Sequence, residues 1–188
     1  MKAGDIMIRF VTSNRGKFEE AKRILNGVDL VWERMEYREV QADTNREVAI
    51  QSLRELKGMV KDPFFLEDSG LYIDALNGFP GPYSSYTFKK IGCKGILKLM
   101  EDIEDRRAYF TSVIAAFIDG KEILVEGTVR GRIAEEERGG GWGFDPIFEP
   151  DGAGGLTFGE LGERKDLFSH RGLALRRFLR VLRDLKYI

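Results

Sequence analysis

The spacing of apolar residues changes along the chain, and these changes predict where strands and helices alternate. Residues 6–12 form a short apolar run that ends in a polar cluster, and apolar positions then recur at helical spacing until the Asn-Gly pair at residues 26–27. Residues 28–35 form a second apolar run, and residues 36–43 are polar and acidic. The chain is therefore predicted to begin with a strand, a helix, a second strand and an acidic loop.

A second helix is predicted to follow the acidic loop. Thr44 is followed three positions later by Glu47, which is the pattern of a capping box, and the apolar stripe that comes next runs until Pro63. Residues 64–66 and 71–73 are apolar segments on either side of a polar triplet. We expect this triplet to lie at the end of a strand.

A long hairpin is predicted in the middle of the chain. The glycine- and proline-rich residues 77–82 can continue neither a strand nor a helix, and a helix is expected near residues 85–100. Residues 108–118 and 123–133 are rich in β-branched and aromatic types, and the Asp-Gly pair at residues 119–120 between them is a strong two-residue turn signal. Two long antiparallel strands follow from this pattern.

The last third of the chain is predicted to hold two glycine-rich loops and a final helix. The loops, residues 139–143 and 151–155, lie on either side of residues 144–148, and Ser169 can cap an amphipathic helix with arginines on its outer faces. We find no repeat and no linker. The mixture of strand-helix units with a hairpin predicts one α/β domain over residues 1–188, with a mixed β-sheet flanked by helices.

Composition narrows the class of protein. With 188 residues and 43% hydrophobic content, the chain can bury roughly 70% of the surface that it exposes when unfolded. The 30 basic and 31 acidic side chains nearly cancel, so we expect no general attraction to nucleic acid or to anionic membranes. The longest apolar stretch is too short to span a bilayer. A single cysteine, Cys93, and the absence of a secretion signal favour the cytoplasm.

A polar turn is predicted between the first strand and the first helix. Free backbone N–H groups and the positive end of the helix converge there, which suits a phosphate. Lys17 adds a mobile cation, and Gly16 allows close approach of the backbone. On spacing alone, a structural helix cap is an equal alternative. The turn consists of Thr12, Ser13, Asn14, Arg15, Gly16 and Lys17.

Two neighbouring carboxylates, Glu67 and Asp68, precede Ser69 and Gly70 in an otherwise apolar stretch. Neighbouring anions repel each other, so a hard divalent cation is one explanation for their clustering. A polar turn that caps the next segment is the other explanation. The loop at residues 36–43 holds further acidic candidates, most of which we expect to be solvated. These are Glu36, Glu39 and Asp43.

The loop around Trp142 combines two aromatic rings with one carboxylate. Trp142 and Phe144 stand in a glycine-rich frame beside Asp145. An aromatic face that stacks on a nucleobase contributes about 1–3 kcal/mol, although aromatic residues at strand ends more commonly belong to the core. The loop is therefore a candidate base platform.

His170 is the one histidine of the chain and stands at the start of the last helix. The sequence argues against a zinc site and a hydrolase triad, because the chain offers neither a second histidine nor a nucleophile elbow. His170 and Arg171 are thus expected either to donate hydrogen bonds to a ligand or to form a helix cap with a surface ion pair. A non-catalytic nucleotide- or RNA-binding protein is disfavoured by the near-neutral charge and the paired carboxylates.

Four segments, taken together and in this order, resemble the inosine triphosphatase family: TSNRGK, LEDSGLYIDALNGFPGPYSS, GWGFDPIFEP and ERKDLFSHRGLAL. The likeness spans nearly the full chain. It implies an elongated, two-lobed α/β fold with a long central mixed β-sheet, a cleft between the lobes and a homodimer. It also implies Mg²⁺-dependent hydrolysis of ITP, dITP and XTP to the monophosphate and pyrophosphate. A related pyrophosphatase acting on pyrimidine or modified nucleotides is the alternative.

The resemblance also implies roles for individual residues. Asp68 would be the catalytic base and a magnesium ligand, and Glu39 would be a second metal ligand. Ser69 would touch the nucleotide. The triphosphate would be held by Thr12, Ser13, Asn14, Arg15, Gly16 and Lys17. The base pocket would be formed by Trp142, Gly143, Phe144, Asp145, Lys165, His170 and Arg171.

Three positions depart from the family's pattern. Many relatives carry a lysine near Ser52, tyrosine or tryptophan is usual where this chain has Phe144, and asparagine is common where it has Asp166. The ring at position 144 therefore lacks a polar contact while it keeps the capacity to stack.

Overall fold

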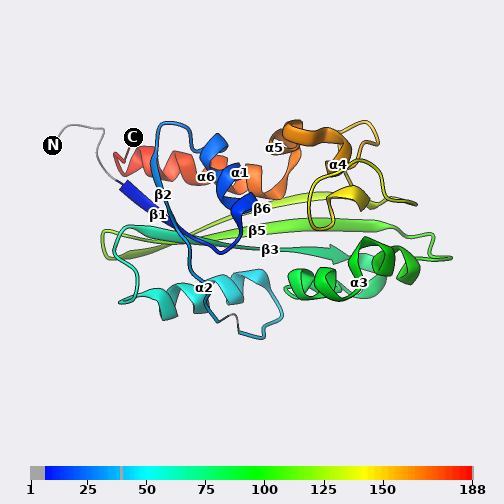
Figure 1. Cartoon of the computed structure of the whole chain (residues 1–188), viewed down its shortest axis with the longest axis horizontal. Coiled ribbons are helices and arrows are strands. Elements are labelled where there is room, and N and C mark those ends of the chain that lie inside the picture. The colour runs from blue at the N-terminus through cyan, green and yellow to red at the C-terminus, as the bar shows by residue number, and fades with distance from the viewer. Residues whose placement is uncertain (1–6, 39, 188) are drawn as a thin grey trace.

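One seven-stranded mixed β-sheet, covered by helices on both faces, organises the molecule (Figure 1). The computed structural model describes residues 7–38 and 40–187. The strands are β1 (Met7–Val11), β2 (Asp29–Glu33), β3 (Phe64–Ile73), β4 (Pro80–Gly81), β5 (Arg107–Ile118), β6 (Lys121–Ile133) and β7 (Phe148–Pro150). The α-helices are α1 (Arg15–Ile24), α2 (Asn45–Leu56), α3 (Ser84–Leu99), α4 (Phe158–Leu161), α5 (Lys165–Phe168) and α6 (His170–Asp184). Short 3₁₀ turns are η1 (Asp74–Leu76), η2 (Asp145–Ile147) and η3 (Gly162–Arg164).

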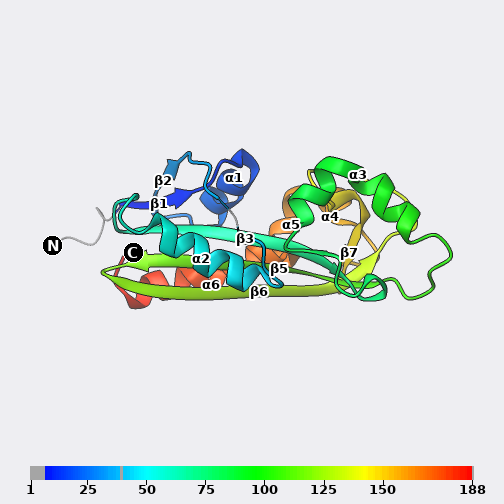
Figure 2. The same ribbon diagram turned by 90° about the horizontal axis from the view of Figure 1, so that it is seen from below.

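The sheet combines a parallel half with an antiparallel half. Its strand order is β2-β1-β3-β5-β6-β7, and β4 pairs with β3 off this path. β1 runs parallel to both β2 and β3, whereas β3, β5, β6 and β7 pair antiparallel in succession. This arrangement confirms the predicted mixed α/β sheet. The molecule is elongated, with the β5–β6 hairpin running along most of its length (Figure 2).

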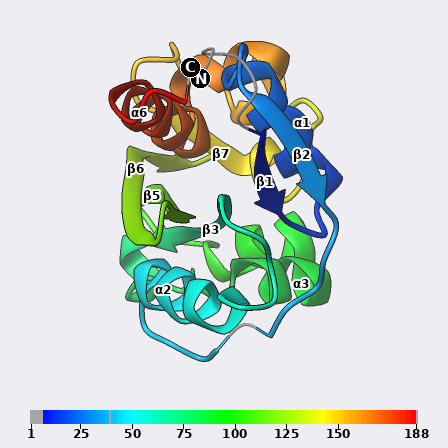
Figure 3. The ribbon, with the colours of Figure 1, turned by 90° about the vertical axis from the view of Figure 1, so that its left-hand side faces the viewer.

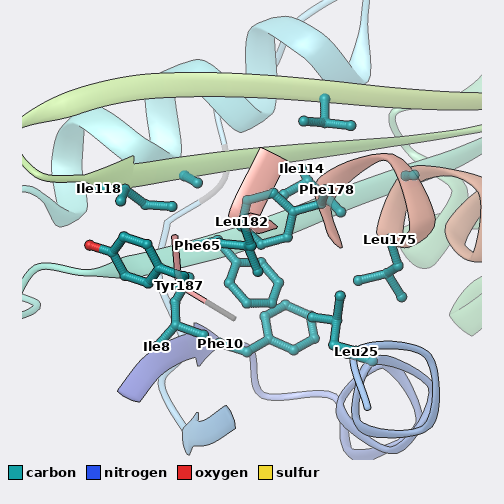
Figure 4. Packing of buried hydrophobic residues seen from close by; sticks show 14 of the residues in the cluster. Ile8, Phe10, Leu25, Phe65, Ile114, Ile118, Leu175, Phe178, Leu182 and Tyr187 are labelled. Atoms are coloured by element: carbon teal, nitrogen blue, oxygen red, sulfur yellow. The ribbon is translucent and has the colours of Figure 1, made fainter. Parts of the chain in front are cut away.

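Helices α1 and α6 cover one face of the sheet, and α2 covers the opposite face (Figure 3). The first face holds an aromatic core in which Phe10 stacks on Phe65, with ring centroids 4.5 Å apart, and Phe65 packs against Phe178 of α6 (Figure 4). A separate apolar cluster joins α3, η2, β7 and α4 at the far end of the hairpin. None of the helices among residues 7–38 and 40–187 has both the length and the apolar character that a membrane crossing requires.

Local signals in the sequence predict several element ends correctly. Asp119 and Gly120 both have positive φ, at 51° and 75°, which is the backbone of a tight hairpin turn, and Ile118 pairs directly with Lys121. Thr44 and Glu47 form the predicted capping box at the start of α2. Local rules were sufficient here because the interacting groups lie within a few residues of one another.

The predicted end of α2 was wrong. The apolar stripe suggested a helix up to Pro63, but α2 ends at Leu56. Gly58 has a φ of 86°, the left-handed backbone that commonly ends a helix. Val60 therefore packs in the core from the connecting segment rather than from the helix.

The polar triplet also lies in a different place from the one predicted. Glu67, Asp68 and Ser69 stand in the middle of β3, which pairs with β5 over its whole length. The strand can continue through them because their polar groups have partners on both faces of the sheet, so none of them needs a water-exposed strand end. Successive strand residues point to opposite faces, so Asp68 faces the side of α2 while Glu67 and Ser69 face the side of α1 and α6.

Candidate active site

A cleft of about 700 Å³ lies where the β1–α1 turn, the middle of β3, the start of α3, the aromatic loop and the start of α6 meet. Lys17 and Asp68 both line it, although they lie far apart in the sequence, in α1 and β3. Most of the residues singled out in the sequence come together here. They are Thr12, Ser13, Asn14, Lys17, Glu36, Glu67, Asp68, Ser69, Trp142, Gly143, Phe144, Asp145, Lys165, His170 and Arg171.

Three candidates do not line the cleft or cannot be placed. The Arg15 side chain points to solvent and pairs with Glu19 at 3.8 Å. Gly16 packs so closely against Trp142 that a Cβ there would lie 3.1 Å from the indole nitrogen. Glu39, the expected second metal ligand, lies outside the described residues.

The β1–α1 turn is a capped helix start that also faces the cleft. The Oδ1 atom of Asn14 accepts a hydrogen bond from the backbone N–H of Lys17 at 3.1 Å, so Asn14 caps α1. The N–H of Asn14 donates to the Thr12 hydroxyl at 3.1 Å. The two alternatives drawn from the sequence are compatible, because the cap holds the positive end of α1 against the cleft.

Glu67 is a buried anion held by two cations. Its Oε2 lies 2.9 Å from the Lys17 ammonium, its Oε1 lies 3.2 Å from Nε of Arg171, and the Ser112 hydroxyl donates to Oε1 at 2.6 Å. Burial alone would raise the pKa of Glu67, but Arg171, Lys17 and the hydrogen bond from Ser112 hold it below its ordinary value. Glu67 therefore remains charged and forms ion pairs with both cations.

Glu20 is a buried carboxylate that sequence reasoning missed. Its Oε2 accepts from Arg171 at 2.7 Å and its Oε1 accepts from Lys165 at 3.1 Å. Lys165 in turn lies 2.9 Å from Oδ2 of Asp145. Arg171 is only 2% exposed, so the alternative of a surface ion pair was wrong, and its pair with Glu20 is buried. A glutamate one turn after Lys17 in a helix is usually exposed, so the residues around Glu20 did not indicate that its carboxylate is buried.

Two cations lie over the aromatic loop. The Lys165 ammonium and the Arg171 guanidinium each lie 5.0 Å from the centre of the Trp142 ring system. Trp142 is 38% exposed, whereas Phe144 is buried and packs edge-on against Phe88 at 5.3 Å. Trp142 is thus the ring of this loop that is available to a ligand, and Phe144 belongs to the core.

The loop is also fastened from α3. Cys93 donates its thiol hydrogen to the carbonyl oxygen of Gly143 at 3.4 Å, and burial raises the pKa of this thiol to about 12. The N–H of Trp142 donates to Asp145 at 3.3 Å. α3 contains a break at Gly92, where φ is 61°, one residue before the cysteine. These contacts hold the loop against the far wall of the cleft.

His170 is a buried, neutral side chain that lines the cleft. Its ring stacks on Phe110 at 4.4 Å. Burial and the nearby cations of Arg171 and Lys165 hold its pKa well below 6.5. Its Nδ1 atom has no hydrogen-bond partner among the residues that the structure describes. The helix cap is provided by Ser169, whose hydroxyl accepts from the N–H of Gly172 at 2.9 Å.

Asp68 is 7% exposed and accepts a hydrogen bond from the side chain of Asn45 at 2.7 Å. The other two departures from the family pattern lie away from the cleft lining. Ser52 is buried on the inner face of α2, and Asp166 pairs with Arg23 at 3.0 Å. Asp166 is therefore neutralised by α1 and does not compete with Asp145 for Lys165.

Comparison with known proteins gives matches over nearly the whole chain. A profile of the Ham1 family matches residues 8–181. The dITP/XTP pyrophosphatase of Korarchaeum cryptofilum is 55% identical over 89% of this chain and 91% of its own, and that of Pyrococcus horikoshii is 50% identical over 96% and 99%. The solved structure of a HAM1 protein from Coxiella burnetii aligns with a TM-score of 0.83 at 30% identity, covering 95% of this chain and 99% of that one.

Proposed function

This chain belongs to the Ham1 family, and from that premise we propose that it hydrolyses noncanonical purine nucleoside triphosphates, namely ITP, dITP and XTP. The products are the nucleoside monophosphate and pyrophosphate. The cleft supports this proposal most directly, because a helix start with a lysine, an acid and a partly exposed indole line one space. These three parts match the triphosphate, the attacking water and the base of one nucleotide.

The triphosphate is assigned to the β1–α1 turn. The positive end of α1 favours an anion at this position. Lys17 is the cation of the turn, and its ammonium is partly exposed at the cleft wall. Because Glu67 already holds Lys17 by an ion pair, the ammonium is fixed in direction before a phosphate arrives.

Asp68 is assigned as the general base. A water molecule attacks the α-phosphorus and gives its proton to the Asp68 carboxylate, while the bond from the α-phosphorus to the bridging oxygen breaks and pyrophosphate leaves. Glu67 is unsuited to this role because Lys17, Arg171 and Ser112 engage its carboxylate. The two neighbouring acids thus have different tasks on opposite faces of β3.

The base is assigned to the other end of the cleft. Trp142 offers its partly exposed ring for stacking. His170, neutral and with Nδ1 unpartnered among the described residues, and Arg171 are the hydrogen-bonding groups placed to meet a six-keto purine. Adenine would present its own amino donor where these groups donate, so they would gain no hydrogen bond from it. This mismatch disfavours ATP.

The residues of the cleft are compatible with Mg²⁺. Among the described residues no three histidine, cysteine, aspartate or glutamate side chains cluster as a metal cage. Mg²⁺, however, usually keeps several waters and takes only one or two protein carboxylates together with substrate phosphates, and Asp68 offers such a carboxylate. When bound, the ion would neutralise phosphate oxygens. Asp68 would hold it, and Glu39 stays a predicted second ligand.

Two further expectations complete the proposal. The chain acts as a homodimer, as its family resemblance implies, and it acts in the cytoplasm, where its nucleotide substrates are. A preference for pyrimidine or modified nucleotides is the alternative within the same chemistry. That preference would require the nucleobase to be recognised without hydrogen bonds from His170 and Arg171.

Product analysis tests this proposal. With Mg²⁺ present, ITP, dITP and XTP should each give monophosphate and pyrophosphate, and turnover should exceed that of ATP, dTTP and UTP. Asp68→Asn should lower kcat by about 10²–10⁴-fold, the usual contribution of a general base. Asp184→Asn is the matched control, because Asp184 is exposed and lies outside the cleft lining. Release of orthophosphate, or a preference for dTTP or UTP, would contradict the proposal.

A further inference from the structure

Three residues of β3, one of which is the proposed base, lie on the same face of the sheet. Asp68, Gly70 and Tyr72 alternate along the strand and therefore point the same way. Gly70 contributes no side chain to this row. A Cβ at position 70 would overlap the Gly81 carbonyl oxygen and come within 2.7 Å of Oδ1 of Asn45. The missing side chain leaves the space into which the amide of Asn45 extends from α2.

The Asn45 amide is hydrogen-bonded at both ends. Its Nδ2 donates to Oδ2 of Asp68 at 2.7 Å, and its Oδ1 accepts from the Tyr72 hydroxyl at 2.7 Å. The backbone N–H of Asn45 donates to the same hydroxyl at 3.3 Å. Asn45 is only 1% exposed, so its amide group is removed from solvent.

The direction of this chain of hydrogen bonds is determined by Tyr72. Burial raises the pKa of Tyr72 to about 12, so the phenol keeps its proton at any pH at which the enzyme would work. Its oxygen accepts the Asn45 N–H, and its proton is therefore directed to Oδ1 of Asn45. The amide must then present its NH₂ group to Asp68. Stacking on Tyr109, with centroids 4.8 Å apart, holds the Tyr72 ring in place.

The fold of α2 does not itself require this amide. Thr44 is the N-cap of α2 and already forms a full capping box with Glu47. Burying a side-chain amide costs free energy unless its groups are hydrogen-bonded. An asparagine at the first helical position would normally point to water, so its burial against Asp68 calls for a role at Asp68.

We propose that Asn45 is a positioning residue that fixes the orientation of the Asp68 carboxylate toward the attacking water, with Gly70 providing the space and Tyr72 orienting the amide. The inference rests on the proposed function, because it concerns the residue assigned there as the base. Asn45 would act on the reaction through its 2.7 Å hydrogen bond to Asp68, and this role requires no contact with the nucleotide. Asn45 is absent from the cleft lining, which fits a role through Asp68 rather than in binding.

The proposal predicts a loss in kcat with little change in KM. Displacing a catalytic group by about 1 Å can cost about 10²-fold in rate, so Asn45→Ala should lower kcat by about 10- to 100-fold while the KM for dITP stays close to that of the wild type. Asn45→Asp keeps the shape and the acceptor for Tyr72, but it replaces the donor with an anion facing Asp68. It should therefore lose at least as much activity as the alanine variant.

Substitution of Tyr72 tests the positioning role of Asn45 independently. Tyr72→Phe removes the hydroxyl that orients the amide and should lower kcat by less than Asn45→Ala. The double variant should be no slower than Asn45→Ala alone, since both changes act through one hydrogen bond to Asp68. Tyr109→Phe is the matched control: it removes a hydroxyl from the other ring of the stacked pair, and no hydrogen bond joins that hydroxyl to Asn45. Its kcat should equal that of the wild type.

Steady-state kinetics with dITP and thermal unfolding of each variant decide the matter. Wild-type kcat in folded Asn45→Asp and Tyr72→Phe proteins, or a change in KM alone, would overturn the positioning role even if Asn45→Ala failed to fold. Equal losses in Tyr72→Phe and Tyr109→Phe would also overturn it, because the effect would then come from the ring pair. An inactive wild-type protein would instead count against the proposed function, so the two failures are distinguishable.

Discussion

The protonation state of each ionisable side chain around the cleft is set by its buried neighbours. Burial raises the pKa of Asp145 although Lys165 lies 2.9 Å away, whereas two cations keep Glu67 charged despite complete burial. His170 is held neutral by burial and by positive neighbours. Single residues of the same chemical type therefore behave differently here, and their environment decides their role.

His170 gives a pH prediction because it is the one histidine of the chain. Its folded pKa lies well below its ordinary value of 6.5, so the unfolded chain takes up a proton first as the pH falls. The stability due to neutral His170 is complete above this value and is lost below it. Between about pH 7.5 and 5.5 the free energy of unfolding should fall by about 1.4 kcal/mol. Denaturant unfolding curves measure this, and His170→Gln should remove the slope; an unchanged slope would contradict the assignment.

Sequence patterns could identify some site residues and not others. Lys17, Asp68 and His170 belong to local motifs whose residue types already indicate chemistry. Glu20 and Asn45 could not be found in that way. Glu20 meets Arg171 across 151 positions of chain, and Asn45 meets Asp68 across 23, so only the fold reveals these contacts.

At the scale of elements, the cleft depends on α1 and α6 being held together. Glu20 of α1 accepts hydrogen bonds from Arg171 of α6 and from Lys165 of α5. The polar contacts lie beside an apolar core in which Phe18 and Ala21 of α1 pack with Phe178 of α6. The ion pairs set the position of the helix starts, and the apolar core holds the rest of both helices.

Replacing Glu20 by glutamine should weaken this junction strongly. The change leaves two buried cations with one fewer counter-charge, which typically costs about 3–5 kcal/mol. Glu19→Gln is the matched control. The carboxylate of Glu19 pairs with Arg15 at the surface, and this pair should contribute only about 0–1 kcal/mol. Chemical denaturation of both variants gives the comparison. Equal losses from the two substitutions would show that the buried pairs do not hold α1 to α6.

Elements differ in how far their sequence predicts them. The capping box of Thr44 and Glu47 and the Asp119-Gly120 turn are local, and the structure has both where the sequence indicates. The continuity of β3 is not local, because it depends on cations and hydrogen bonds from α1, α2 and α6 that make polar residues tolerable inside a strand. A polar triplet in isolation favours a turn, and the tertiary partners reverse that preference.

Over the whole molecule, the site lies between the two ends of an elongated sheet. One end carries β1, β2 and α1, the other carries α3, α4 and β7, and the cleft is lined from both (Figures 1 and 2). The mixed sheet could be predicted from strand-helix alternation together with the hairpin signal. The cleft could be expected only from the family resemblance. The spacing of apolar residues predicts single elements and does not show how the two ends of a sheet are placed relative to each other.

The central claim is that water attacks the α-phosphorus of a purine triphosphate beside Asp68. Turnover of dITP in water enriched in the heavy isotope of oxygen, followed by mass spectrometry of both products, tests it most directly. The account predicts one heavy oxygen in the nucleoside monophosphate and none in the pyrophosphate, with the reaction nearly abolished in Asp68→Asn. Heavy oxygen in the pyrophosphate, or full activity without the carboxylate, would contradict it.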